Sequence, residues 1–240
     1  MRYYVISDTH SFYTETVNAL AAVGYFADTK PNKLIILGDF FDRGKESWAM
    51  QEFLLDQMAG DKVILIRGNH EDLFLELADK DNGIAYNQHV TNGTYHTALA
   101  LTGMSKNEAY VNYLLAENMR KTPFYKKIIP STVDYYETEN YVFVHGWIPE
   151  IDDWRKANPY QWAEARWTNG MKAVKQTKEP KTIVCGHWNC SYGHSKRDNI
   201  PELGDGANFE PYYEKGIIAI DACTAYSRKV NCIVLEDNPL

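Results

Sequence analysis

The sequence predicts an α/β fold, because short apolar runs rich in β-branched residues alternate with stretches whose apolar residues recur every three or four positions. The runs expected to be strands are residues 3–7, 33–37, 62–66, 141–144 and 182–185. Helices are expected at residues 14–23 and 47–58 and from about residue 71. Two closing runs, 216–220 and 229–235, flank a turn and are predicted to form a hairpin.

One domain is expected for all 240 residues, because a single α/β core can organise a chain of this length. Two stretches break the alternation and are predicted to be insertions. Residues 80–130 are expected to form a small cap, with a helix over 106–119 whose apolar side is Tyr110, Val111, Leu114, Leu115 and Met119. Residues 188–215 are rich in glycine, proline and aromatic residues and are predicted to form an irregular loop.

The composition excludes several classes of protein. The formal net charge of −7 disfavours binding to nucleic acid or to anionic membranes. No apolar run approaches the roughly 20 residues that a membrane helix needs, and the first residues leave no room for a secretory signal. We therefore expect a cytoplasmic protein with no membrane or nucleic-acid partner, whose four cysteines are reduced and serve mainly as small buried hydrophobes.

Polar residues that bind metals or phosphate follow five of the predicted strands. In an open α/β sheet the carboxyl ends of the strands line the crevice where ligands bind, so these residues are expected to converge. Glycines adjoin most of them, which allows the backbone to turn sharply or to approach an ion closely. Nitrogen and oxygen donors without thiolate suit Mn, Fe or Zn. The candidate metal ligands are Asp8, His10, Asp39, Asn69, His145 and His187.

Five motifs occur in order along the chain: Asp-x-His at 8–10, Gly-Asp-x-x-Asp-Arg-Gly at 38–44, Gly-Asn-His-Glu at 68–71, His-Gly at 145–146 and Gly-His at 186–187. In this pattern the sequence resembles the calcineurin-like metallophosphoesterase superfamily, and within it the bacterial type of the phosphoprotein (serine/threonine) phosphatase branch. The resemblance implies two mixed β-sheets packed as a sandwich and flanked by helices. It also implies two divalent metal ions as cofactors, with manganese favoured over iron or zinc.

The resemblance implies a role for each motif residue. The first metal would be bound by Asp8 and His10, the second by Asn69, His145 and His187, and both by Asp39. His70 would be the general acid, Asp42 would orient it, and Arg43 would bind the phosphate. A hydroxide shared by the metals would attack phosphorus directly, without a phosphoenzyme.

The chain departs from the family pattern at two places. Asn169 stands where relatives carry a second phosphate-binding arginine; Arg166 is a candidate substitute, with a surface salt bridge as the alternative, and both residues are tentative substrate contacts. Asn189 replaces the second histidine of a Gly-His-x-His motif, which favours the phosphoprotein phosphatase branch over nuclease-like branches. His194 is expected to be a loop histidine and not a ligand.

The predicted function is metal-dependent hydrolysis of a phosphomonoester, with phosphoserine or phosphothreonine of a protein as one candidate substrate. The alternative is a dinucleoside polyphosphate or another small phosphate compound. From a different class, a non-catalytic metal-binding scaffold remains open, although intact His70, Asp42 and Arg43 argue against it. The sequence does not indicate an oligomeric state.

Overall fold

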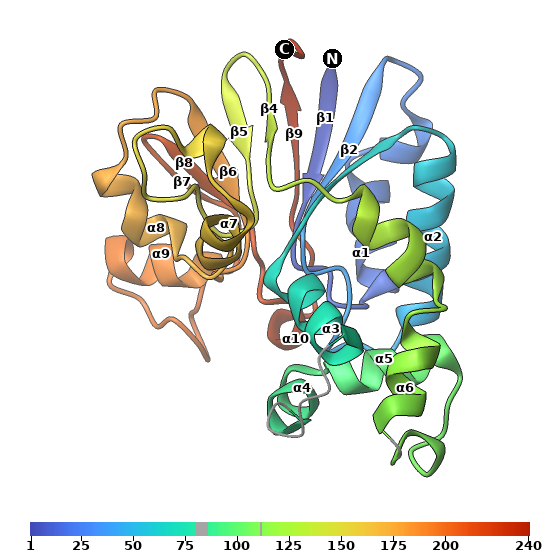
Figure 1. Ribbon diagram of the computed structural model, residues 1–240. Coiled ribbons are helices and arrows are strands. Elements are labelled where there is room, and N and C mark those ends of the chain that lie inside the picture. The colour runs from blue at the N-terminus through green and yellow to red at the C-terminus, as the bar shows by residue number, and fades with distance from the viewer. Residues whose placement is uncertain (80–85, 111) are drawn as a thin grey trace.

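The computed structural model describes residues 1–79, 86–110 and 112–240, and it contains two mixed β-sheets that pack face to face (Figure 1). The first sheet has the order β3-β2-β1-β9. Its strands are β1 (Arg2–Ile6), β2 (Asn32–Leu37), β3 (Val63–Ile66) and β9 (Cys232–Glu236). The first three are parallel, and β9 runs antiparallel to β1. The predicted α/β class and the paired mixed sheets are confirmed.

The second sheet has the order β4-β5-β6-β8-β7. Its strands are β4 (Tyr136–Glu137), β5 (Tyr141–Phe143), β6 (Thr182–Cys185), β7 (Tyr212–Glu214) and β8 (Ile217–Ala219). The central strands β5, β6 and β8 are parallel, and the two edge strands are antiparallel to their neighbours. Five predicted strands therefore lie at or within one or two residues of their expected positions.

Each sheet turns one face toward the other sheet and the opposite face toward helices, and the alternation of side chains along β1 shows this arrangement for the first sheet. Tyr3 and Val5 point between the sheets and pack with Phe143 and Val184, whereas Tyr4 and Ile6 face the opposite way. The outer face of the first sheet is covered by α1 (Tyr13–Ala22) and α2 (Ser47–Ala59), and that of the second by α7 (Pro159–Ala165), α8 (Gly170–Ala173) and α9 (Cys190–Asp198). Because the inter-sheet core draws on both halves of the chain, we propose that residues 1–240 form one domain.

The predicted cap is a group of short helices that follows β3. The chain passes from β3 into α3 (Asn69–Asp79), and the predicted cap, residues 80–130, then contains α4 (Tyr86–Asn92), α5 (Thr94–Thr102), α6 (Asn112–Met119), the 3-10 turns Glu108–Tyr110 and Ile129–Ser131, and a π-helical turn, Phe124–Ile128. The helix predicted over 106–119 is confirmed only in its second part, as α6, because its first part contains the 3-10 turn Glu108–Tyr110. Buried Leu115 and Met119 join the core beneath the first sheet as expected; the side chains of Tyr110 and Val111 lie outside what the structure describes. Figure 1 shows α4, α5 and α6 below the lower end of the first sheet.

The predicted final hairpin is wrong. The two closing strands, β8 and β9, belong to different sheets, and the segment between them contains α10 (Thr224–Ser227). The connection is too long for a tight turn. Instead β9 pairs with β1, which buries Ile233 between the sheets.

The predicted irregular loop at 188–215 is also wrong in part, because it contains α9 and β7. The sequence of α9 has few apolar residues, so its pattern does not indicate a helix. Gly193 lets α9 approach the second sheet closely: a Cβ there would lie 2.6 Å from Met171 Sδ and 2.7 Å from Tyr212.

Three further 3-10 turns complete the secondary structure: Tyr25–Ala27, Trp154–Lys156 and Val174–Gln176. Within the described ranges, no helix has the length and apolar character needed to cross a membrane.

Candidate metal centre

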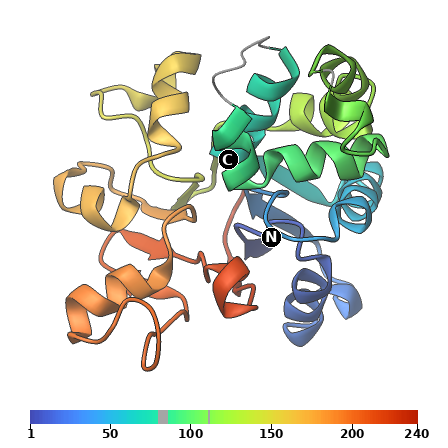
Figure 2. The same cartoon turned by 90° about the horizontal axis from the view of Figure 1, so that it is seen from below.

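The predicted ligands follow β1, β2, β3, β5 and β6, at the edge of the sheets opposite the two termini; Asn69 is the first residue of α3, and the other five lie in loops. Figure 2 looks toward this edge. Most non-glycine residues with a positive φ in the described chain occur in these loops, among them Asp8 (50°), His10 (46°), Asp39 (53°) and His187 (63°). Such backbone costs about 1–3 kcal/mol per residue and tends to occur at functional sites.

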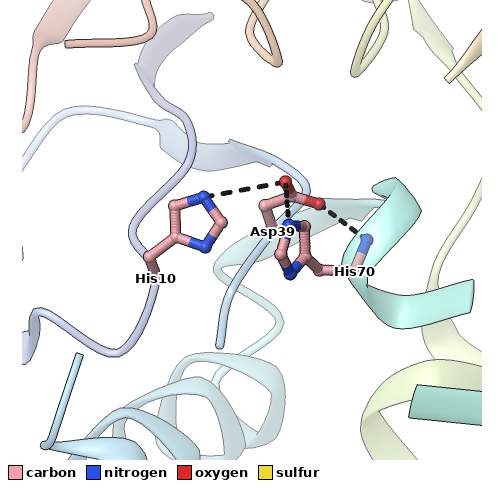
Figure 3. Close-up of side chains that lie close together, drawn as sticks. All are labelled: His10, Asp39 and His70. Carbon is pink, nitrogen blue, oxygen red and sulfur yellow. Dashed lines mark hydrogen bonds and ion pairs between the residues drawn. The ribbon is translucent and has the colours of Figure 1, made fainter. Parts of the chain in front are cut away.

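Asp39 is the centre of the cluster (Figure 3). Its Oδ2 atom lies 3.8 Å from Nε2 of His10 and 3.8 Å from Nε2 of His70. Its Oδ1 atom lies 3.4 Å from Nε2 of His145 and accepts the backbone N–H of His70 at 3.0 Å. Two groups of three residues therefore share Asp39: His10, Asp39 and His70, and Asp39, His145 and His187. In each group the candidate ligand atoms lie within 4.8 Å of one another.

Asp8 and Asn69 are attached to the same cluster. The Oδ2 atom of Asp8 accepts the backbone N–H of His187 at 2.9 Å. The Oδ1 atom of Asn69 lies 2.8 Å from Nε2 of His145. Gly68 and Gly186 make these approaches possible, because a Cβ at either position would lie 2.2 Å from a carboxylate oxygen of Asp39 or Asp8. All six predicted ligands therefore lie in one cluster.

Two histidines are oriented by backbone carbonyls. Nδ1 of His10 lies 2.8 Å from the carbonyl oxygen of Phe41, and Nδ1 of His145 lies 2.5 Å from that of Leu37. If each Nδ1 carries the proton and donates it, each Nε2 presents its lone pair toward Asp39. This is the form of imidazole that binds a metal ion.

The charges of the cluster favour cations. Burial alone would raise the pKa of Asp39, but the surrounding histidines, first among them His145, lower it well below its usual value. Burial lowers the pKa of His10 and of His145, and burial together with His145 lowers that of His187 to about 3. In each of these three histidines the shift favours the neutral imidazole. Neutral imidazoles around carboxylates are a donor set that fits divalent metals such as Mn, Fe or Zn.

His70 has an additional carboxylate partner. Its Nδ1 atom lies 2.6 Å from Oδ2 of Asp42, and both side chains are almost fully buried. Burial by itself would lower the pKa of His70, but Asp39 and the hydrogen bond to Asp42 raise it above its usual value. The pKa of His70 is thus shifted in the opposite direction from those of His10, His145 and His187.

The cap holds Asp42 in place through two threonines that the sequence analysis missed. Thr94 Oγ1 donates to Oδ2 of Asp42 at 2.7 Å, and Thr97 Oγ1 donates to Oδ1 at 2.6 Å. The backbone N–H of Asp42 in turn donates to Thr97 Oγ1 at 3.0 Å. Gly93 starts α5 against this loop. The turn-forming sequence Asn92-Gly93-Thr94 was the feature of the sequence that could have pointed to these threonines. It does not reveal which carboxylate they contact.

Two more buried carboxylates were missed. Glu71 accepts the backbone N–H groups of Asp39, Phe40 and Gly68 at 2.8–3.0 Å, and burial together with Asp39 raises its pKa to about 8. Asp221 accepts the N–H of Cys223 at 2.7 Å, and burial raises its pKa to about 6. Asp221 follows β8 as the other site residues follow their strands, but the incorrect hairpin prediction hid this pattern.

The three candidate phosphate contacts are placed differently. Arg43 is exposed, and its Nη2 atom lies 3.4 Å from Nε2 of His70. Arg166 is 5% exposed and uses both terminal nitrogens in ion pairs, with Asp72 at 2.6 Å and with Asp134. Asn169 begins α8, where its Oδ1 atom accepts the backbone N–H of Lys172 at 3.3 Å. Of the three, only Arg43 extends from beside His70 into solvent.

His194 lies on α9, not in a loop as predicted. Its Nε2 atom is 3.0 Å from the carbonyl oxygen of Glu210, and its Nδ1 atom is 3.4 Å from Asp198. Neither group of candidate ligands contains it. Its contacts link α9 to the segment before β7.

Solved structures with the same fold include three that match nearly the whole chain. A structure described as a candidate diadenosine tetraphosphatase has a TM-score of 0.58 and 14% identity, with 98% of this chain and 89% of that chain covered. A cold-active protein-tyrosine phosphatase from Shewanella sp. has a TM-score of 0.56 and 19% identity, with coverages of 99% and 76%. A protein serine/threonine phosphatase from Saccharomyces cerevisiae has a TM-score of 0.52 and 14% identity, with coverages of 100% and 80%.

At these identities the structural likeness shows the fold alone. A comparison with curated proteins finds no match. The model of the calcineurin-like phosphoesterase family matches residues 1–215. The chain belongs to the calcineurin-like phosphoesterase family and is a phosphoesterase hydrolase.

Proposed function

We propose that this chain hydrolyses phosphomonoesters with a dinuclear metal centre held by Asp8, His10, Asp39, Asn69, His145 and His187. The observation that carries the proposal is the position of Asp39, whose two oxygens face the two groups of histidines. Manganese is the metal that the family resemblance favours; the donors themselves, imidazole, carboxylate and amide without thiolate, suit Mn, Fe or Zn. Two divalent cations held by these residues would supply Lewis-acid activation of a water molecule and would stabilise the charge on the phosphoryl oxygens.

His70 donates the proton that the leaving oxygen needs when the phosphorus–oxygen ester bond breaks. Its proton is available because Asp39 and Asp42 raise its pKa, and its orientation is maintained by Asp42 through Nδ1. Arg43 binds the phosphoryl oxygens next to His70. Its guanidinium suits this role because it is exposed and, within the described part of the chain, forms no salt bridge.

Arg166 acts as a positioning residue in this scheme. Both of its terminal nitrogens are engaged by Asp72 on α3 and by Asp134. Its backbone carbonyl lies against Gly146, where a Cβ would come within 2.5 Å of it. Arg166 therefore ties the helix that carries His70 to the loop that follows His145, and it has no terminal nitrogen left for phosphate.

The proposal is tested with p-nitrophenyl phosphate and chelator-treated protein, before and after addition of Mn²⁺. We expect Mn²⁺ to restore turnover in the wild type and not in Asp39→Asn. His70→Asn is a matched variant, because it should still bind two Mn²⁺ ions per chain while losing turnover. A wild-type protein that binds Mn²⁺ but hydrolyses no phosphoester would instead support the scaffold alternative. Binding of fewer than two ions would contradict the dinuclear centre.

A further inference from the structure

Two lysines and two aromatic rings form a cluster between α8 and α9, which are both orange in Figure 1. We call Lys172, Trp188, Tyr192 and Lys196 the lysine–aromatic platform. The ammonium of Lys172 lies 5.8 Å from the ring centroid of Trp188 and 5.2 Å from that of Tyr192. The ammonium of Lys196 lies 5.5 Å from the centroid of Tyr192. Contacts of this kind attract the cation to the ring face, so the exposed Lys172 side chain has a preferred position.

The platform adjoins the candidate metal centre. Trp188 follows His187 in the chain, and their ring centroids are 6.0 Å apart. The ring centroid of Trp188 therefore lies within 6.0 Å of both the Lys172 ammonium and the ring centroid of His187, a candidate metal ligand. Arg43, by contrast, lies beside His70. Arg43 is therefore linked to the cluster through His70, and Lys172 is linked to it through Trp188 and His187.

The positive charge of the platform is not neutralised by the protein. Among the residues that the structure describes, neither Lys172 nor Lys196 forms a salt bridge, although the chain as a whole carries a formal net charge of −7. Two buried donors that belong to residues in contact with Lys172 also lack an acceptor, the amide nitrogen of Asn169 and the indole nitrogen of Trp188. Asn169 is only 8% exposed. Lysines without a carboxylate partner suit an anionic ligand, which would contact their exposed ammonium groups and not the two buried donors.

We propose that Lys172 binds a second phosphate of the substrate while Arg43 contacts the phosphate that reacts. This inference rests on the proposed function and extends its substrate class to compounds with linked phosphates, such as a nucleoside polyphosphate, in which the bond that breaks is a phosphoanhydride. Lys172 is then a specificity-determining residue. Because the aromatic rings already restrict its side chain, less conformational entropy is lost on binding than for an unsupported lysine.

The test compares two inhibitors of p-nitrophenyl phosphate hydrolysis in excess Mn²⁺: inorganic phosphate, and imidodiphosphate, whose P–N–P bridge resists hydrolysis. In Lys172→Met we expect the inhibition constant of imidodiphosphate to rise about tenfold, and that of phosphate to change less than about twofold. Lys172→Arg should restore most of the affinity. Lys175→Met is the matched control, because it removes the same charge from an exposed lysine that stands over no ring within the described residues.

Equal weakening of both inhibitors, an unchanged constant for imidodiphosphate, or the same effect in Lys175→Met would overturn the proposal. Calorimetric titration of the Mn²⁺-loaded protein with imidodiphosphate gives the same comparison without turnover. A protein that hydrolyses no ester but loses imidodiphosphate binding in Lys172→Met would contradict the proposed function and support the second phosphate site.

Discussion

Replacing Thr97 with valine tests how the cap supports the candidate general acid. Thr97 is 2% exposed, and its hydroxyl both donates to Oδ1 of Asp42 at 2.6 Å and accepts the Asp42 N–H at 3.0 Å. Valine has nearly the same shape but can make neither hydrogen bond. The substitution therefore removes polar contacts of Asp42 without creating a cavity.

The size of the effect follows from these two bonds. A hydrogen bond to a charged acceptor contributes about 1.5–3 kcal/mol, and an unpaired buried N–H costs about 1–3 kcal/mol. Both hydrogen bonds of Asp42 involve the same Thr97 hydroxyl, so their contributions are not additive. We expect the free energy of unfolding to fall by about 2–4 kcal/mol. Asp42 keeps its contacts with Thr94 and His70 at 2.7 and 2.6 Å, so His70 should be misaligned and not lost.

The assay compares kcat for phenyl phosphate with kcat for p-nitrophenyl phosphate. Phenolate is a poorer leaving group than p-nitrophenolate and therefore depends more on a proton donor. We expect kcat to fall about tenfold with phenyl phosphate, equivalent to about 1.4 kcal/mol in the activation free energy, and to fall less with p-nitrophenyl phosphate. Thr91→Val is the control, because Thr91 is an exposed cap residue whose hydroxyl donates to the carbonyl oxygen of Asn87. Equal losses with both esters would refute the reasoning.

Three further predictions address other parts of the structure. Glu71→Gln places an amide among three backbone N–H donors, and we expect calorimetry to show Mn²⁺ affinity reduced by about 10–100-fold; unchanged affinity would exclude Glu71 from positioning the ligands. Gly93→Ala puts a Cβ 2.5 Å from the backbone nitrogen of Arg43 at a φ of 95°, and urea unfolding should show that the free energy of unfolding falls by about 2–4 kcal/mol. In the control Gly103→Ala the Cβ meets nothing within 4 Å, and the expected fall is about 1 kcal/mol. The pKa of Glu137 is lowered to about 2, first by its hydrogen bond to Arg155, so the ionised carboxylate stabilises the fold above about pH 4.5 and this stabilisation is lost as the pH falls toward 2. Glu137→Gln should therefore lower the free energy of unfolding by about 1–2 kcal/mol at pH 7, after solvent screening. A stability advantage of the wild type that does not shrink in urea titrations at acid pH would contradict this prediction.

Much of the candidate site could be predicted from the sequence, because each candidate ligand follows closely after an apolar strand. Asp8, Asp39 and His145 lie after β1, β2 and β5, and the carboxyl ends of parallel strands meet at one edge of a sheet. The order and spacing of the motifs then indicated both the family and the acid candidate, His70. Each motif consists of neighbouring residues, and local backbone preferences suffice to place such residues directly after a strand.

Only the tertiary structure decided the features that depend on contacts between distant segments. The pairing of β9 with β1 joins residues more than 200 positions apart, and the contacts of Asp42 with Thr97, or of Arg166 with Asp72, join different elements. The pattern of α9 is hidden because it packs through small residues such as Gly193 and Cys190. A sequence shows which side chains can hydrogen-bond or pair; which partner each one meets is determined by how the sheets and helices pack.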